Sequence, residues 1–197
     1  MKTLNKIIFY VLSWTWGCIM TVIGAIGALG LLITGHKPKR FHHMIYFEVG
    51  RSWGGVNFGM FFFTSKGCGL STKQHETGHG FQNAVLGPLF PFLVGLPSAT
   101  RCLLYDFPTR KSKTKYCVIL YIIISVVSIG LAVLTLLTIP WTVVFPIFLF
   151  LYGTALCGWL LFVETPKFDK GYVNYYSVWF EGQASRLGEK YCPSEVL

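Results

Sequence analysis

The sequence has few charged residues and very few acidic ones. Charged residues make up 13% of its 197 residues, and only eight of them are Asp or Glu, against 17 Lys and Arg. A soluble domain carries about 25% charged residues. This composition excludes an ordinary water-soluble domain, and the 53% of apolar residues favours a membrane protein. The length suits one domain, and no change of composition along the chain requires a second.

Paired cysteines are missing as well. The chain has six cysteines but no CxxC pair, and half of them lie inside apolar runs, at Cys18, Cys117 and Cys157. This placement argues against a disulfide framework and against a redox motif. We interpret all six as free thiols or small apolar packing residues.

Long apolar runs stand in place of charge. The first, at about 7–34, is uncharged and long enough to cross a bilayer with some tilt. It exceeds the core of a cleaved signal peptide, which is the alternative interpretation. Two more runs, at about 116–138 and 142–163, flank Ile139-Pro140-Trp141 and predict antiparallel spans joined by a tight turn. A fourth segment, at about 89–105, is interrupted by Pro and Gly, and either crosses with a kink or re-enters.

The net charge of +9 is clustered beside these runs. Four basic residues within Arg110–Lys115 precede the second uninterrupted run, and such loops mark the cytoplasmic face. This topological explanation is favoured over binding to nucleic acid, so the lipid bilayer is the expected partner. The first run has basic residues at both ends, and the stronger cluster, Lys37–Arg40, favours an outside N-terminus.

The segment after the first run changes character. Aromatic and β-branched residues surround a glycine-bearing turn at Arg51–Gly55 and predict a β-hairpin at about 44–63, with strands Met44–Val49 and Val56–Phe63. A broken helix or re-entrant segment is the alternative. An open strand edge cannot face lipid, so the hairpin must lie against protein, in a wet cavity or at the interface.

The expected fold class is therefore mainly α, a polytopic membrane protein forming one membrane-embedded domain. It contains about four transmembrane or re-entrant helices, a helix that carries the motif described next, and the small β-hairpin.

His75-Glu76-Thr77-Gly78-His79 is a complete HExxH sequence on a helix predicted at about 72–86. Histidines four residues apart project from one helix face, so both imidazoles can reach one metal ion. The intervening Glu76 is placed to take the proton of a metal-bound water. Ionisable groups inside an apolar protein are costly and usually functional. The pattern therefore predicts a zinc (Zn2+) site with Glu76 as its catalytic base.

A catalytic zinc site needs three protein ligands and an open position. Among the few acidic residues, Glu181 is the best third ligand, because small residues surround it on a helix predicted at about 172–190. A surface acid on an interfacial helix is the alternative. Gln82 and Asn83 extend the stripe of the histidines, and either orient the ligands and line the site or only bond to helix neighbours.

At these residues the sequence resembles gluzincin membrane proteases of the CAAX-prenyl-protease and HtpX type. That family pairs HExxH with a later Glu followed closely by Ala-Asp, and Glu181-Gln183-Ala184-Arg186 falls in that frame. The resemblance places Ser185 and Arg186 beside the site. Ser185 stands where the family has an aspartate that supports a zinc histidine, so its hydroxyl can hydrogen-bond but brings no charge.

The chain also resembles a group of small bacterial membrane proteins in which an HExGH helix precedes a late Glu helix. The shared features are Gln82, Gly87-Pro88-Leu89 and Gly95-Leu96-Pro97-Ser98. The resemblance implies metallopeptidase chemistry by analogy. A bacterial inner (plasma) membrane is the expected location. The positive loops predict a zinc site near the cytoplasmic interface.

The leading hypothesis is a membrane-embedded zinc metallopeptidase that hydrolyses peptide bonds of membrane-associated peptides or membrane proteins through zinc-activated water. Substrate could add as a strand beside Val56, Asn57 and Phe58. Candidates for stabilising the oxyanion are Tyr172, Tyr175, Tyr176 and Arg186. The alternatives are a non-catalytic zinc-binding membrane scaffold, which Ser185 favours, and a small transporter with a polar intramembrane helix.

Overall fold

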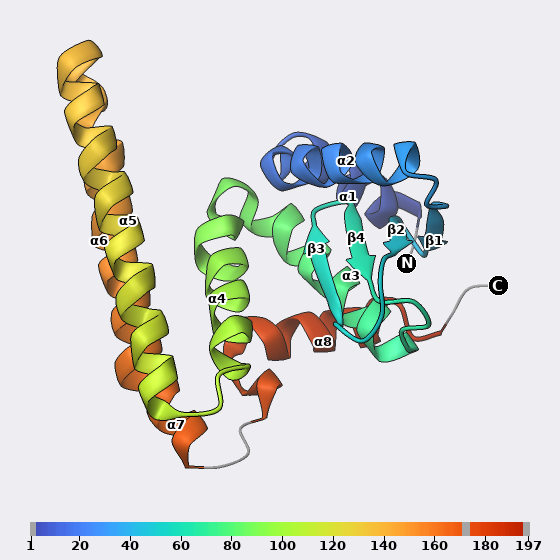
Figure 1. Ribbon diagram of the computed structural model, residues 1–197. Coiled ribbons are helices and arrows are strands. Elements are labelled where there is room, and N and C mark those ends of the chain that lie inside the picture. Colours follow the sequence, from blue (N-terminus) through green and yellow to red (C-terminus); the bar gives the residue numbers. More distant parts are fainter. Residues whose placement is uncertain (1–2, 171–173, 195–197) are drawn as a thin grey trace. The chain divides into compact units, whose positions relative to one another are not determined.

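The computed structural model describes residues 3–170 and 174–194 and is mainly helical, with one small sheet (Figure 1). The chain divides into two compact units. Unit 1 comprises Met1–Leu96 and Tyr175–Leu197, and unit 2 comprises Pro97–Asn174. The motif helix and the late Glu helix both belong to unit 1, although about a hundred residues separate them along the chain.

Unit 1 contains four α-helices among its described residues. They are α1 (Thr3–Trp14), α2 (Cys18–Ile33), α3 (Leu70–Leu86) and α8 (Trp179–Tyr191). Shorter helical turns are η1 (Gly87–Leu89), the π-helical η2 (Pro91–Gly95) and η5 (Tyr175–Ser177). Helix α3 covers the motif helix predicted at about 72–86. Helix α8 begins at Trp179, later than the predicted start at about 172, and ends at Tyr191, close to the predicted end at about 190.

The apolar run predicted as one span at about 7–34 is not one straight helix. Helices α1 and α2 are bent by 86° at a break that includes Trp16 and Gly17. The indole Nε1 of Trp16 donates to the carbonyl of Val85 at 3.1 Å, and Asn83 Nδ2 donates to the carbonyl of Gly17 at 3.1 Å. A Cβ at position 17 would approach Asn83 Nδ2 to 2.5 Å, so the contact requires glycine. Contacts with the end of α3 therefore stabilise this bend between α1 and α2, the α1–α2 elbow.

The predicted two-stranded hairpin is instead a four-stranded sheet. Its strands are β1 (Lys39–Phe41), β2 (Met44–Glu48), β3 (Gly55–Phe58) and β4 (Phe61–Thr64), in the order β1-β2-β4-β3. The outer pairs are antiparallel, and β2 pairs with β4 in parallel.

The predicted second strand, Val56–Phe63, contains a turn. Gly59 has φ +67°, a left-handed conformation that favours glycine, and its N–H donates to Asn57 Oδ1 at 2.9 Å. The chain therefore folds back on itself there and makes β3 and β4 from one apolar run. As a result β3, rather than a longer strand, forms one edge of the sheet.

Both faces of this sheet are covered. Gly24 and Gly27 of α2 lie against Phe58 and Phe63 on one face, and Gly80 of α3 lies against Met44 on the other. A strand buried on both faces has no polar side to show, which explains why Phe61-Phe62-Phe63 is continuously apolar. Through this packing the sheet supports the middle of the motif helix.

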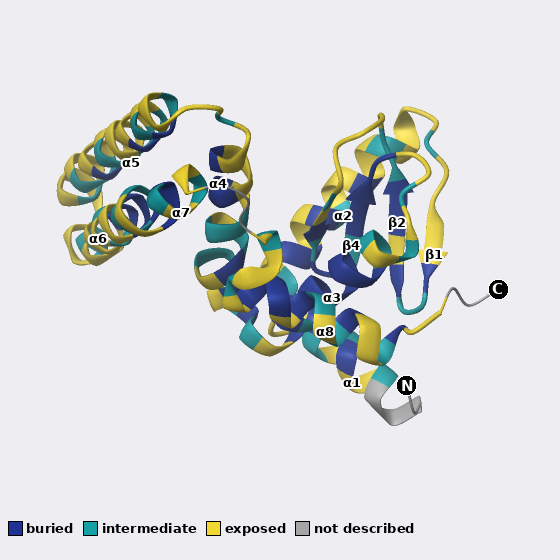
Figure 2. Cartoon of the chain, turned by 90° about the horizontal axis from the view of Figure 1, so that it is seen from below, coloured by how far each residue is buried: buried dark blue, intermediate teal, exposed yellow. Residues whose placement is uncertain are grey.

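Unit 2 is built around a long helical hairpin. Its elements are α4 (Leu96–Tyr105, from Pro97 onward), α5 (Arg110–Thr138), η3 (Pro140–Val143), α6 (Val144–Trp159), the π-helical η4 (Leu160–Glu164) and α7 (Thr165–Asp169). Most residues of α5 and α6 are exposed (Figure 2).

Two helical stretches of unit 2, Arg110–Thr138 and Pro140–Asp169, are long and apolar enough to cross a membrane. They contain the runs predicted at about 116–138 and 142–163. Two bent helix pairs, α1 with α2 and Leu70–Leu89 with Pro91–Tyr105, meet the same criterion only when each pair is counted as one span. The described residues thus contain two candidate spans, or up to four.

A buried ion pair connects two elements of unit 2. Arg101 Nε of α4 donates to Glu164 Oε2 of η4 at 2.7 Å, and both side chains are almost completely buried. The other carboxylate oxygen of Glu164 accepts from Lys167 at 2.7 Å. Glu164 is therefore held between two cations, which is how a carboxylate can remain buried in a helical hairpin.

We predict that Arg101→Met destabilises the protein by about 3–5 kcal/mol, because it leaves the buried Glu164 without its main cation. The free energy of unfolding can be measured by denaturant titration of the purified protein in detergent micelles. The matched control is Arg110→Gln, which removes a contact with Asp169 from a side chain that is 74% exposed and should cost less than about 1 kcal/mol. Equal losses in the two variants would contradict the prediction.

Candidate metal centre

Helices α3 and α8 approach each other closely because small residues stand at their contact. A Cβ on Gly78 would collide with the backbone of Ala184, and a Cβ on Gly188 would collide with the backbone of Gln74. The sequence predicts such close packing from the small residues around Glu181, and the structure has it. The spacing brings the side chains of the two helices into direct contact.

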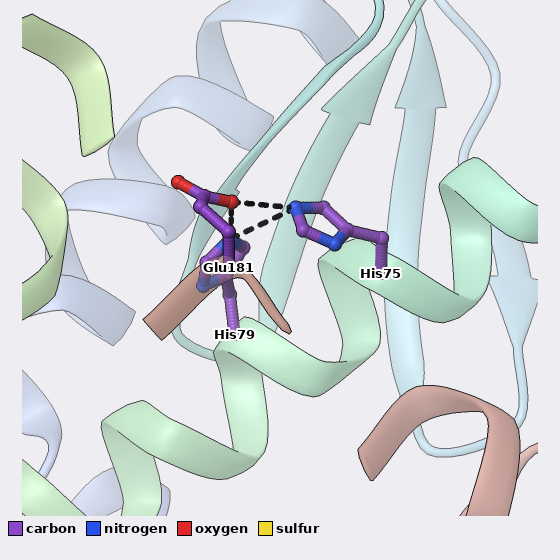
Figure 3. A group of neighbouring side chains, drawn as sticks. All are labelled: His75, His79 and Glu181. Atoms are coloured by element: carbon purple, nitrogen blue, oxygen red, sulfur yellow. Dashed lines mark hydrogen bonds and ion pairs between the residues drawn. The ribbon is translucent and has the colours of Figure 1, made fainter. Parts of the chain in front are cut away.

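His75 and His79 of α3 and Glu181 of α8 converge at this contact (Figure 3). The two histidine Nε2 atoms are 3.1 Å apart, and they lie 3.0 and 3.4 Å from Glu181 Oε2. Ligand atoms bound about 2.0–2.1 Å from a tetrahedral zinc ion lie roughly 3.3 Å from one another. The three atoms therefore have spacings close to those of ligands on one face of a tetrahedral metal site.

The orientation of His79 is determined by Gln82. Gln82 Nε2 donates to the carbonyl of Phe180 at 2.8 Å and to Gln183 Oε1 at 2.9 Å, so Gln82 Oε1 is the atom that faces His79 Nδ1, at 2.8 Å. An amide oxygen only accepts, so His79 Nδ1 carries a proton. In the neutral imidazole, Nε2 then presents a lone pair to Glu181.

The other two candidate ligands, His75 and Glu181, also have hydrogen-bond partners. His75 Nδ1 hydrogen-bonds to Ser185 Oγ at 2.9 Å, and Tyr175 donates its hydroxyl to Glu181 Oε1 at 3.2 Å. Ser185 is thus the direct hydrogen-bond partner of His75. Partners of this kind orient metal-binding residues and influence their affinity for the metal.

The centre has the electrostatics of a cation site. Glu181 is completely buried, and Glu76 is 4% exposed. Burial disfavours a charged His79, but the hydrogen bond to Glu181 and the charges of Glu76 and Glu181 outweigh it, so the pKa of His79 is raised above its ordinary 6.5. Lone pairs and a carboxylate that face one another in a buried place favour a bound cation. These three residues could hold a metal ion.

Glu76 lies beside the three ligands but is not one of them. Burial, the largest influence, raises the pKa of its carboxyl above the ordinary 4.5, while His79 and His75 act in the opposite direction. Its Oε1 lies against Gly55 of β3, where an added Cβ would come within 2.7 Å. Its buried Oε2 has no hydrogen-bond partner within residues 3–170 and 174–194. Burying a carboxylate oxygen without a hydrogen-bond partner costs free energy.

The remaining predicted residues lie at different distances from the ligands. Gln82 and Ser185 contact the histidines directly, whereas Asn83 contacts the α1–α2 elbow through Gly17. Arg186 is exposed on α8. The predicted substrate strand corresponds to β3, in which Val56 is exposed, Asn57 is buried and Phe58 is half-buried.

Among the tyrosines considered for the oxyanion, Tyr175 is engaged with Glu181. The ring of Tyr176 lies 5.3 Å from that of His75, and Tyr172 lies outside the described residues. Sequence reasoning missed Gln183 as a partner of Gln82. Its only signal was proximity to Glu181, because no helical periodicity connects positions 181 and 183 to one face.

No protein-family model, curated protein or solved structure matches the chain. The function therefore has to be inferred from the geometry of the centre itself.

We predict that His79→Ala and Glu181→Ala each abolish stoichiometric zinc binding, because either change leaves two ligands. Ser185→Ala should weaken zinc binding about 10–100-fold, and Ser185→Asp should restore it. Elemental analysis and competition with a zinc-binding dye measure these effects on purified protein. The matched control is Glu189→Ala, which removes an exposed carboxylate from the same helix. Full zinc occupancy in Glu181→Ala would show that another group completes the site.

Proposed function

We propose that the protein is a zinc metallopeptidase that cleaves peptide bonds in membrane-associated substrates. The observation that carries the proposal is the triangle of His75, His79 and Glu181 ligand atoms with a separate buried carboxylate, Glu76, next to it. Two histidines and one glutamate are the ligand set of many catalytic zinc sites, which keep a fourth position open.

Zinc suits this donor set better than a hard cation. Imidazole nitrogens favour zinc and other transition metals, whereas calcium and magnesium prefer sites made of oxygen ligands. When bound, zinc would supply a Lewis acid and would lower the pKa of a water molecule to about 7. The supporting contacts from Gln82, Ser185 and Tyr175 would hold the ligands in place and limit reorganisation during turnover.

Glu76 is the proposed general base. It follows a zinc ligand directly on α3, and its unpartnered Oε2 could accept a proton from the attacking water. The same carboxylic acid could then donate that proton to the leaving amine. Its raised pKa supports this double use, because a base that must later act as an acid works best when its pKa approaches the working pH.

The sheet offers a place for an extended substrate. Strand β3 is an edge strand, and its first residue, Gly55, lies against Glu76. A peptide that adds to the outer edge of β3 would therefore pass beside the proposed base. In the antiparallel pairing of β3 with β4, Ser65 N–H donates to the carbonyl of Gly54, so Gly54 and Ser65 form a hydrogen-bonded pair. Hydrogen-bonded and non-hydrogen-bonded pairs alternate along such a ladder. Asn57 is therefore in a non-hydrogen-bonded pair, and its backbone N–H and C=O point to the outer edge of β3.

The candidate spans of unit 2 support a membrane-associated substrate. Arg110–Thr138 and Pro140–Asp169 could anchor the protein in a bilayer, where peptides near the surface or within the lipid are concentrated.

A zinc-binding scaffold without turnover is the second candidate, and Ser185 favours it. A neutral hydroxyl behind His75 makes that ligand less basic than a carboxylate would. The two candidates differ in one respect, because only the peptidase requires Glu76 as a base.

For the peptidase we predict that Glu76→Gln keeps zinc bound but lowers cleavage at least about 100-fold, because the amide cannot take up a proton. Cleavage of fluorescently labelled casein in detergent micelles and zinc content are measured on the same preparations. Glu189→Gln is the matched control and should keep full activity. Equal activity of the wild type and Glu76→Gln, or no cleavage of any peptide by the zinc-loaded wild type, would favour the scaffold.

We also predict that Asn57→Pro lowers cleavage at least about tenfold, because it removes an outward N–H of the edge strand. Asn57→Ala removes the same side-chain contacts with Gly59 but keeps the N–H, so it should retain most activity. Zinc content should be unchanged in both variants. Similar cleavage by the Pro and Ala variants would rule out substrate binding at this edge.

A further inference from the structure

Apart from the metal centre, a cluster of mainly basic residues lies at one end of the helical hairpin of unit 2. Residues 97–174 contain seven basic and three acidic residues, and none of the ten lies in the apolar stretch from Tyr116 to Val163. Arg110 at the start of α5 and Asp169 at the end of α7 are 3.5 Å apart, so these two segments meet at the same end (Figure 1).

Two of the three carboxylates are already neutralised inside the unit. Glu164 is buried between Arg101 and Lys167. Asp169 lies 3.5 Å from Arg110 and 3.8 Å from Lys113. Each of these carboxylates therefore has two cations, which leaves an excess of positive charge even before other residues are counted.

Three further lysines at this end have no acidic partner. Lys111, Lys115 and Lys170 are exposed, and no ion pair joins them to a carboxylate in the part of the chain that the structure describes. Asp106, the remaining acid of unit 2, is exposed and lies in the turn before α5.

Internal stability does not explain the placement of Lys111. Lys111 lies in the first turn of α5, and the N-terminus of a helix carries a partial positive charge from the helix dipole. A cation in this turn is therefore unfavourable. No acidic residue occurs in that turn to compensate. Anions outside the protein would remove the repulsion.

The apolar surface that continues from these lysines indicates which anion. Val118, Ile119 and Ile122 on the next turns of α5 are each about half exposed, at 47%, 45% and 53%. A ligand with a phosphate and a hydrocarbon chain would fit both surfaces, with the phosphate on the lysines and the chain along α5. Nucleic acid or free phosphate would leave the apolar surface uncovered.

We propose that Lys111, Lys115 and Lys170 form a binding surface for the phosphate headgroup of an anionic phospholipid. The cations that pair with carboxylates, Arg101, Arg110, Lys113 and Lys167, are not required to contact the lipid. The surface would select anionic lipids at the end of the hairpin and so fix how deep unit 2 sits in the bilayer. This proposal is independent of the chemistry of the metal centre.

The experiment is a lipid competition on full-length protein. Purified protein in detergent micelles receives equal amounts of dioleoyl phosphatidylglycerol and dioleoyl phosphatidylcholine, and native mass spectrometry counts the lipids retained by each chain. Because one cation near an anionic surface favours binding about fivefold, the wild type should retain phosphatidylglycerol in at least about fivefold preference. The triple variant Lys111→Gln, Lys115→Gln, Lys170→Gln should lose most of that preference.

The control variant removes the same number of exposed lysines from unit 1, at Lys37, Lys66 and Lys190, and should keep the preference. Size-exclusion elution and near-ultraviolet circular dichroism of both triple variants report that unit 1 is folded, and the helical signal in far-ultraviolet circular dichroism reports on the long helices of unit 2. An absence of preference in the wild type, or equal losses in the two triple variants, would overturn the proposal. So would loss of the preference in an excess of inorganic phosphate, which would indicate a site for the free anion.

Discussion

The close contact between α3 and α8 is the constraint on which the metal centre depends. Gly78 and Gly188 leave no room for a side chain where each helix meets the backbone of the other. Because the helices approach so closely, Glu181 lies 3.0 and 3.4 Å from the two histidine nitrogens. A larger residue at either glycine would separate the helices, and a carboxylate moved by even 1 Å would no longer share an ion with both imidazoles.

Hydrogen bonds then convert proximity into a defined electrostatic environment. Gln82 is bonded to the backbone and a side chain of α8, so its oxygen can only face His79, and the lone pair of His79 turns inward. Ser185 and Tyr175 act on His75 and Glu181. His79 and Glu181 both present electron pairs to one buried point, and such groups repel each other unless a cation lies between them. This requirement, rather than likeness to any known protein, supports interpreting the centre as a metal site.

The charged residues of the two units follow different rules. In unit 1 the buried carboxylates Glu76 and Glu181 face histidines, whose charge depends on a proton or a metal. In unit 2 the buried Glu164 instead faces Arg101 and Lys167, so its carboxylate is paired with two basic side chains and with no histidine among these contacts. The first arrangement suits chemistry, because its charge state can change. The second suits structure, and it leaves the exposed lysines of the same unit as the surplus.

The sequence alone determined the features that depend on neighbours along the chain. Apolar runs specified the helices of unit 2, the i, i+4 spacing placed His75 and His79 on one face of α3, and small residues around Glu181 indicated close packing. Only the tertiary structure decided that the first apolar run bends at Gly17, that β2 and β4 pair in parallel, and that Gln82 turns to the metal centre while Asn83 turns to the elbow. Each of these results comes from contacts between segments distant in the chain, and helical or strand periodicity carries no information about which distant segment a side chain meets.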